Sequence, residues 1–167
     1  MIIWLTGLPC SGKTTLAKLV AEEIEAEWLD GDVLRNSPFS KGIGFTKGER
    51  DLHLGRVGYL AERLNKYVDV VCSFVSPHEE TRDKLPIDLL VYIECPVMEC
   101  MKRDVKGMYK KAIQGEIRGF TGVDAPYEEP TNPDIIVRTA SHSIEGCVQL
   151  ILMAIREKID VIRKKEL

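Results

Sequence analysis

The strongest chemical signal in the sequence is a glycine-rich segment over residues 7–14, which fits the pattern G-x-x-x-x-G-K-[ST] at every fixed position. An apolar run precedes it and an amphipathic stretch follows it, as a phosphate-binding loop requires. Glycines let backbone N–H groups approach phosphate oxygens, and the N-terminus of the following helix stabilises the anion. The residues expected to bind the nucleotide are Gly7, Pro9, Cys10, Ser11, Gly12, Lys13, Thr14 and Thr15.

Two side chains of this segment have the chemistry for phosphoryl transfer from ATP. Lys13 should reach the β- and γ-phosphates and act catalytically, while the Thr14 hydroxyl should bind Mg²⁺. A chance glycine-rich turn is the weaker interpretation, because both flanking patterns are correct. Cys10 occupies an unconstrained position, and a reactive thiol there would need a depressed pKa. The motif identifies the phosphate donor and leaves the acceptor open.

A pair of carboxylates, Asp30 and Asp32, follows the short apolar run Trp28-Leu29. If that run is a strand, both carboxylates lie at the C-terminal edge of an open α/β sheet, where ligands bind. We therefore predict that they are catalytic, with Asp30 orienting an attacking hydroxyl and holding Mg²⁺ through water. The alternative is a helix N-cap beside a turn aspartate. Arg35 follows at a distance suited to binding an acceptor anion.

Short apolar runs alternate with helical patterns along the chain. This alternation predicts one α/β domain over residues 1–167, with three layers and a central parallel sheet. Residues 36–48 and 115–133 contain many helix breakers and read as long loops. The predicted strands are Ile2–Leu5, Trp28–Leu29, Val68–Val75, Leu89–Ile93 and Ile135–Val137. The predicted helices are Thr14–Ile24, Arg50–Leu64, Pro96–Arg103 and Ser143–Ile162, the last with Ser143 as its cap.

Composition narrows the class of partner. A net charge of −3 gives no general attraction to nucleic acid or anionic membranes, and no apolar run has membrane-spanning length. The five cysteines are odd in number and include no C-x-x-C pair, which favours free thiols in a reducing compartment. We therefore expect a cytoplasmic protein that acts on a small molecule.

Several separated blocks resemble adenylylsulfate kinases, also called APS kinases, over almost the whole chain. The resemblance includes the phosphate-binding loop, the 30–35 segment and the stretch from Gly44 to Arg50. It also includes Phe74-Val75-Ser76-Pro77 and, most specifically, the run from Arg103 to Glu128. The resemblance implies a P-loop NTPase fold of about five parallel strands with a mobile lid at about residues 104–128. It implies transfer of the ATP γ-phosphoryl group to the 3′-hydroxyl of adenylylsulfate, in sulfate assimilation.

The resemblance also implies roles for individual residues. Phe45 and Phe120 match positions that sandwich the acceptor's adenine, and aromatic faces suit such stacking. Arg103, at the start of the lid segment, is expected on the ATP side. The residues expected to bind the acceptor are Asp30, Arg35, Phe45, Arg50, His53, Val75, Ser76, Lys106 and Phe120, of which Arg35, Arg50 and Lys106 neutralise the phosphosulfate.

Three features depart from the family pattern: His53 stands where the family usually has asparagine, residues 36–43 differ, and Pro9 replaces the usual serine. Histidine cannot present an amide's donor and acceptor together, so a different nucleotide acceptor, such as cytidine diphosphoramidate, is an alternative. A catalytically silent nucleotide-binding module is a second alternative, against which the intact Lys13, Thr14 and Asp30 argue. The family is often dimeric, and the apolar positions of the helix predicted at 143–162 could form a homodimer interface.

Overall fold

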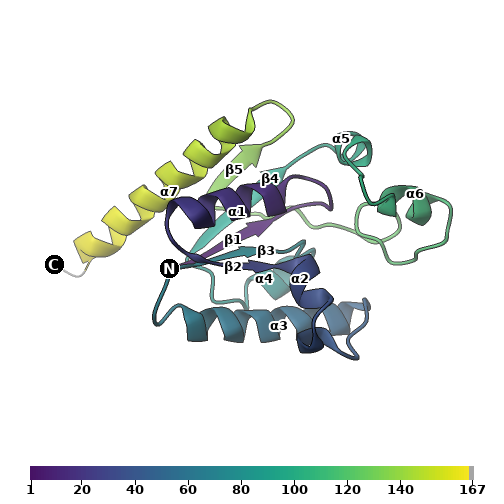
Figure 1. The fold of residues 1–167 in the computed structure, drawn as a ribbon, viewed down its shortest axis with the longest axis horizontal. Coiled ribbons are helices and arrows are strands. Elements are labelled where there is room, and N and C mark those ends of the chain that lie inside the picture. Colours follow the sequence, from purple (N-terminus) through teal and green to yellow (C-terminus); the bar gives the residue numbers. More distant parts are fainter. Residues whose placement is uncertain (166–167) are drawn as a thin grey trace.

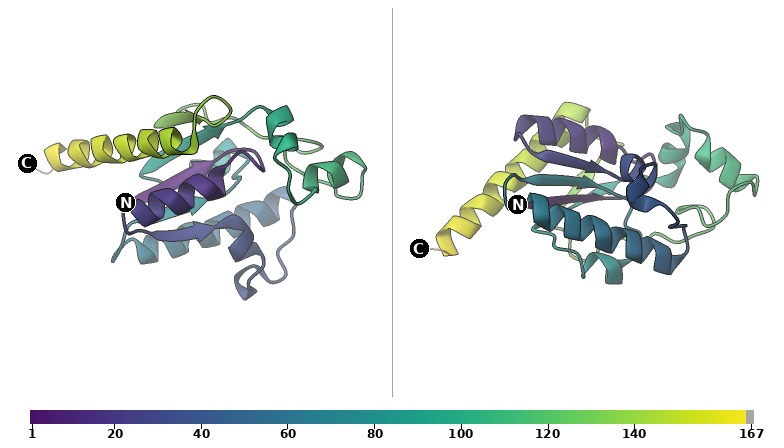
Figure 2. Two further views of the ribbon diagram at one scale, coloured as in Figure 1. Left: turned by 45° about the horizontal axis from the view of Figure 1, so that its top comes forward. Right: turned by 60° about the horizontal axis from the view of Figure 1, so that its bottom comes forward.

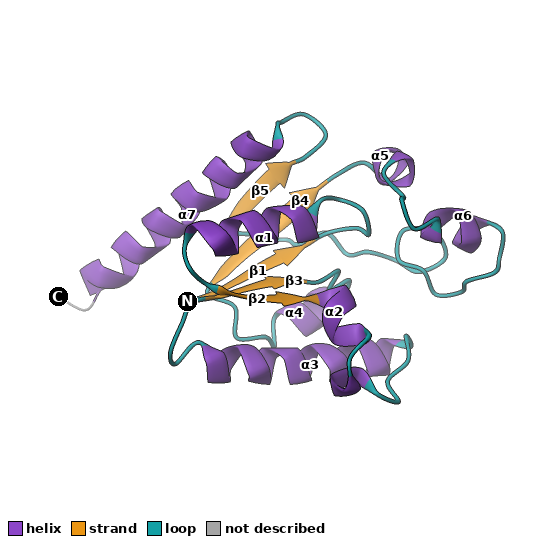
Figure 3. Cartoon of the chain, viewed as in Figure 1, coloured by secondary structure: helices purple, strands orange, loops and turns teal. Residues whose placement is uncertain are grey.

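The computed structural model describes residues 1–165, and its centre is a five-stranded parallel sheet (Figures 1 and 3). The strands lie in the order β2-β3-β1-β4-β5. All five predicted strands are confirmed, although β3 is shorter than the predicted 68–75. The strands are β1 Ile2–Thr6, β2 Glu27–Asp30, β3 Val70–Ser73, β4 Leu89–Glu94 and β5 Ile135–Arg138.

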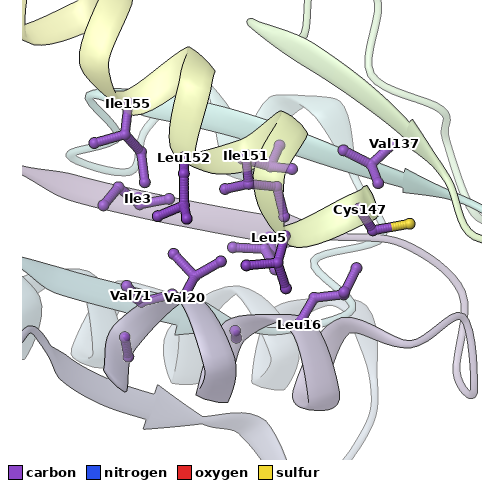
Figure 4. Packing of buried hydrophobic residues seen from close by; sticks show 14 of the residues in the cluster. Ile3, Leu5, Leu16, Val20, Val71, Val137, Cys147, Ile151, Leu152 and Ile155 are labelled. Carbon is purple, nitrogen blue, oxygen red and sulfur yellow. The ribbon is translucent and has the colours of Figure 1, made fainter. Parts of the chain in front are cut away.

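Helices cover both faces of the sheet and complete the predicted three layers. The face that carries Leu5 and Ile93 packs against α1 (Lys13–Glu23) and α7 (Ile144–Lys165), as Figures 2 and 4 show. The opposite face packs against α3 (Lys47–Leu64). Every residue of β1 is buried, which is why its sequence is a continuous apolar run rather than an alternating one.

The predicted helices are confirmed to within a few residues, and local capping explains where two of them start. The Thr46 hydroxyl accepts from the N–H of Glu49, whose carboxylate accepts in return from the N–H of Thr46, so α3 begins before the predicted Arg50. Ser143 caps α7 as predicted, because its hydroxyl accepts from the N–H of Gly146.

Short helices are where the sequence-based prediction was wrong. The predicted loop at 36–48 contains the 3₁₀-helix η1 and the start of α3, and three α-helices lie where none was predicted. The four additional helices are too short for their sequences to show a helical period. The additional elements are α2 Gly31–Arg35, η1 Pro38–Ser40, α4 Glu79–Arg82 and α6 Met108–Ile113; the predicted helix at 96–103 is α5, Val97–Lys102.

The C-terminal ends of the strands lie at one edge of the sheet, and the register aligns them. Ser73 at the end of β3 pairs with Asp30 of β2 and with Leu5 of β1, so the loop that follows β1 and the carboxylate at the end of β2 are brought together. The segment from α5 through α6 extends beyond this edge (Figure 1). Over residues 1–165, no helix is both long and apolar enough to cross a membrane.

Candidate active site

The loop of residues 7–14 has the backbone of an anion cradle. Gly7, Cys10 and Gly12 all have positive φ values, of 155°, 61° and 103°. A Cβ added to Gly7 would lie 2.5 Å from the carbonyl oxygen of Ile93, so the approach of this loop to β4 requires glycine. Gly12 is the N-cap of α1, whose first turn therefore points its free N–H groups at the loop.

Lys13 is a buried cation inside this cradle. Its side chain is only 7% exposed, and its ammonium group donates to the carbonyl oxygen of Leu8 at 2.7 Å and to Ser11 Oγ at 3.5 Å. Within residues 1–165 no carboxylate forms an ion pair with it. Burial lowers the pKa of Lys13 to about 8. A bound phosphate would supply the missing negative charge.

Thr14 and Asp30, the residues predicted to bind Mg²⁺, are joined by a hydrogen bond. Thr14 Oγ1 donates to Asp30 Oδ2 at 3.0 Å, and Ser73 Oγ donates to the same oxygen at 2.9 Å. The other oxygen, Oδ1, accepts from the N–H groups of Asp32 and Val33, so Asp30 is also the N-cap of α2. Both interpretations of Asp30 are therefore compatible: the cap fixes the carboxylate, and Oδ2 faces the loop. Hydroxyl and carboxylate oxygens are ligands that suit Mg²⁺ and its bound water.

Asp32 lies on the exposed side of α2 and reaches the lid segment. Its carboxylate forms an ion pair with Lys106, and the two side chains are 68% and 62% exposed. Cys10 Sγ lies 3.9 Å from Asp104 Oδ1 in the same segment, and burial and this carboxylate raise the pKa of the thiol. A raised pKa disfavours the thiolate, which is the reactive form of a cysteine.

Two arginines flank one exposed phenyl ring, and the three side chains, Arg35, Arg50 and Phe45, form the predicted acceptor cluster. The guanidinium carbons of Arg35 and Arg50 lie 4.7 and 5.6 Å from the centre of the Phe45 ring, which is 62% exposed. Arg35 donates to the carbonyl oxygen of Gly44 at 2.9 Å. Burial and the charge of Arg50 lower the pKa of Arg35. Two cations beside a largely exposed aromatic ring suit a ligand that combines an anionic group with a planar base.

Arg50 also joins this cluster to the lid segment. It donates to the carbonyl oxygen of Gly119 at 2.6 Å and to Thr121 Oγ1 at 3.3 Å. Phe120 therefore lies in the peptide segment that Arg50 binds, although its ring is partly buried and packs edge-on against Tyr109 with centroids 4.9 Å apart. The structure thus brings the segments of Phe45 and Phe120 to the same region through Arg50.

Ser76 and Val75 lie in the loop after β3, the strand that lies between β2 and β1 in the sheet. Ser76 is buried and has a positive φ of 43°. Its hydroxyl accepts from Trp4 Nε1 at 2.9 Å, and the Val75 carbonyl oxygen accepts from Thr6 Oγ1 at 2.7 Å. These bonds fix the loop at the edge of the sheet.

His53 lies behind the acceptor cluster, only 2% exposed. Its Nδ1 lies 3.1 Å from Ser40 Oγ, which also lies 2.8 Å from the carbonyl oxygen of Leu34. The tautomer of the ring decides whether Ser40 or His53 donates in this contact. Burial and the charge of Arg35 lower the pKa of His53 to about 4, so the ring is neutral. Nε2 has no partner within residues 1–165.

Comparison with known proteins decides the family. The adenylylsulphate kinase family model matches residues 1–138. The chain belongs to the adenylylsulphate kinase family. An adenylyl-sulfate kinase of Chloroflexus aurantiacus is 41% identical over 98% of this chain and 92% of its own length. A probable adenylyl-sulfate kinase of Pseudomonas aeruginosa is 45% identical over 90% of this chain and 75% of its own length.

A solved structure supports both the family and the fold. The Mycobacterium tuberculosis APS kinase CysC, in complex with AMPPNP and APS, has a TM-score of 0.86 and 34% identity to this chain, and the match covers 93% of this chain and 96% of that one. The sequence-based family, the P-loop kinase fold and the assignment to ATP-dependent phosphotransferases are confirmed.

In this family member, Arg103 reaches the donor loop through a residue that sequence analysis missed. Arg103 donates to Thr139 Oγ1 at 3.1 Å and to its carbonyl oxygen at 3.0 Å, and Thr139 Oγ1 donates to the carbonyl oxygen of Ser11 at 2.8 Å. Thr139 follows β5 directly, so its place at the C-terminal edge of a predicted strand was the signal that could have found it. Ser73 is a second missed residue: the predicted strand ran to Val75 and placed Ser73 inside it, whereas the observed β3 ends at Ser73.

Proposed function

We propose that this chain transfers the γ-phosphoryl group of ATP to the 3′-hydroxyl of adenylylsulfate, giving 3′-phosphoadenylylsulfate and ADP. The observation that carries the donor half is Lys13, a buried cation with an anion cradle around it and no carboxylate partner in the described chain. The named activity of the relatives and the bound APS of the Mycobacterium tuberculosis structure support the acceptor half.

The residues of the donor side would act through charge and orientation. Lys13 neutralises charge that develops on the transferring phosphoryl group. Thr14 and Asp30 would hold Mg²⁺, Asp30 through water, and the ion would shield the phosphates. Asp30 Oδ2 would accept a hydrogen bond from the 3′-hydroxyl of the acceptor and orient it for attack. The carboxylate is held in place because Oδ1 accepts from the N–H groups that it caps. Asp32 acts less directly, through its ion pair with Lys106.

The residues of the acceptor side would hold the phosphosulfate and the adenine. Arg35, Arg50 and Lys106 supply positive charge, and Phe45 supplies an exposed aromatic face. When the acceptor binds, its anion competes with the backbone carbonyls that Arg35 and Arg50 now contact. The segment at 104–128 would then close as a lid and exclude water from ATP.

A panel of acceptors tests the proposal in a coupled assay of ADP release, with the product identified by mass. We expect turnover with adenylylsulfate far above that with AMP or cytidine diphosphoramidate. Turnover confined to another nucleotide would replace the acceptor and keep the donor chemistry. No turnover with any acceptor would favour a silent nucleotide-binding module.

The remaining proposals concern assembly and location. Most apolar side chains of α7 lie in the core, including Cys147, Ile151 and Leu152. A homodimer through this helix would therefore depend on its exposed apolar residues, such as Ile144 and Met153. A cytoplasmic location and a single domain over residues 1–167 remain proposals from composition and length.

A further inference from the structure

Arg82, at the end of α4, is a buried arginine that the proposed chemistry does not use. Arg82 is only 3% exposed, and a charged side chain is rarely buried this completely unless it is paired. Its Nη1 donates to the carbonyl oxygen of Ser76 at 2.6 Å. Its Nη2 donates to the carbonyl oxygen of Glu128 at 2.7 Å and to the carboxylate of Glu79. One guanidinium group therefore joins two segments that are distant in the sequence.

The first of these segments is the turn at Ser76, which needs external support. Its φ of 43° is in the left-handed region, which a non-glycine residue occupies only when its surroundings determine it. Arg82 holds the carbonyl oxygen of Ser76, and Trp4 holds its hydroxyl. The turn lies beside Val75, whose carbonyl oxygen is bound to Thr6 at the end of β1.

The second segment is residues 127–131, where the predicted lid at about 104–128 joins the chain that leads to β5. We call these residues the C-terminal root of the lid. The N–H of Glu128 donates to the carbonyl oxygen of Pro77 at 2.8 Å, and its carboxylate accepts from the N–H of Glu79 at 2.7 Å. Glu79 also accepts from the N–H of Thr131 at 3.0 Å. The Arg82 guanidinium carbon lies 5.8 Å from the centre of the Tyr127 ring. The lid root and the Ser76 turn are thus bound to the same short helix.

Arginine is required by the geometry of this junction. Its planar group directs separate N–H donors at two carbonyl oxygens and a carboxylate, whereas a lysine ammonium is a single point charge that cannot span them. Glu79, three residues earlier on the same helix, balances its charge. The ion pair and the two carbonyl contacts together fix the geometry of the junction.

We propose that Arg82 is a positioning residue that fixes the Ser76 turn and the C-terminal root of the lid as one unit. Lid closure and acceptor placement are then coupled, because neither segment can shift without the other. The assignment of the Ser76 turn to the acceptor rests on the proposed function. The junction itself does not touch the donor loop that carries Lys13.

The test compares Arg82→Lys and Arg82→Met with wild type. We expect kcat/KM for the acceptor to fall by up to about 100-fold, because a small displacement of bound groups costs that much. KM for ATP should stay within about twofold of wild type. Acceptor-independent ATP hydrolysis should rise relative to transfer, because a loosened lid root admits water.

Two further variants separate positioning from stability. Ile155→Ala removes a core side chain of α7 remote from the site, so it should lower the melting temperature without changing the ratio of hydrolysis to transfer. Glu79→Gln keeps the shape of the junction but removes the carboxylate charge that pairs with Arg82. It should therefore lower kcat/KM for the acceptor and raise ATP hydrolysis relative to transfer, each by less than the Arg82 variants do. It also tests the proposal if Arg82→Met does not fold.

The proposal is overturned if the Arg82 and Glu79 variants resemble Ile155→Ala, with a lower melting temperature but unchanged coupling and acceptor KM. Failure of the proposed function looks different. Wild type would then ignore adenylylsulfate, and the same measurements would be made with the nucleotide it uses. The hydrolysis ratio reports on the lid root whichever acceptor is correct.

Discussion

The donor loop and the acceptor cluster hold their functional groups in opposite ways. The donor loop is built from backbone: Gly7 lies against the carbonyl of Ile93, and Lys13 is buried. The acceptor cluster is built from side chains, with Phe45 exposed and Arg35 bound to the carbonyl oxygen of Gly44. The donor site is thus formed in advance, whereas the acceptor site must exchange internal contacts for ligand contacts, which lowers affinity.

The largest expected effect is on the donor side. Lys13→Ala should lower kcat by about 10²- to 10³-fold, because it removes a preorganised charge from the transferring phosphoryl group. Steady-state kinetics together with the melting temperature check this. Lys18→Ala, an exposed lysine on the same helix, is the matched control and should change neither. Near-normal turnover of a folded Lys13→Ala protein would contradict the donor assignment.

A smaller effect is expected on the acceptor side. Arg50→Ala should lower kcat/KM for the acceptor by about 10- to 100-fold. This corresponds to the roughly 1.5–3 kcal/mol that a hydrogen bond to a charged group contributes. KM for ATP should change little. Arg63→Ala, exposed on the same helix α3, serves as the control. An equal rise in both KM values would show that the two regions are not separable as described.

The pH dependence gives a third comparison. Burial lowers the pKa of Lys13 to about 8 in the free protein, and only its cationic form attracts the phosphates. Above that pH the neutral amine dominates, so kcat/KM for ATP should fall by up to about tenfold per pH unit. Below that pH, the titration of Lys13 should not change kcat/KM for ATP. At saturating ATP, kcat/KM for the acceptor should lack this inflection, because the bound phosphates keep Lys13 protonated. An identical inflection in kcat/KM for the acceptor would contradict the assignment.

The smallest effect concerns His53. His53→Asn should lower the free energy of unfolding by about 1–3 kcal/mol, because the bond to Ser40 and the packing around the ring are lost. With adenylylsulfate as acceptor, activity should survive. Leu52→Ala, an exposed neighbour, is the control. A selective change in kcat/KM between adenylylsulfate and a cytidine nucleotide would instead indicate that His53 contacts the base.

The depressed pKa of His53 also predicts a change in stability with pH. The unfolded chain binds a proton near pH 6.5 and the folded chain only near pH 4, so the unfolded state gains protons first as the pH falls. Stability should therefore decrease as the pH drops from about 6.5 towards about 4. Denaturant titrations at several pH values should show this loss in wild type and a smaller loss in His53→Asn.

The sequence was sufficient for the sheet and for the donor site because both follow local rules. A buried parallel strand is a continuous apolar run, and the loop that follows β1 needs glycines at fixed positions. Arg82 could not be given a role in the same way. Its contacts are with carbonyl groups that approach from distant segments, and no local pattern records which carbonyl will lie beside a given side chain. The short helices α2 and α4 were not predicted for a related reason, because a single helical turn is too short to show a hydrophobic period.

The ion pair between Asp32 and Lys106 joins residues 74 apart in the sequence, and both side chains are largely exposed to solvent. Solvent-exposed pairs are weakened by dissolved ions, whose screening length is about 8 Å at physiological ionic strength. The junctions made by Arg50 and Arg82 are more buried and respond less. We therefore expect raised ionic strength to weaken this one contact between α2 and the 104–128 segment, while the buried bond from the Tyr109 hydroxyl to the carbonyl oxygen of Pro9 and the contacts of Arg82 persist.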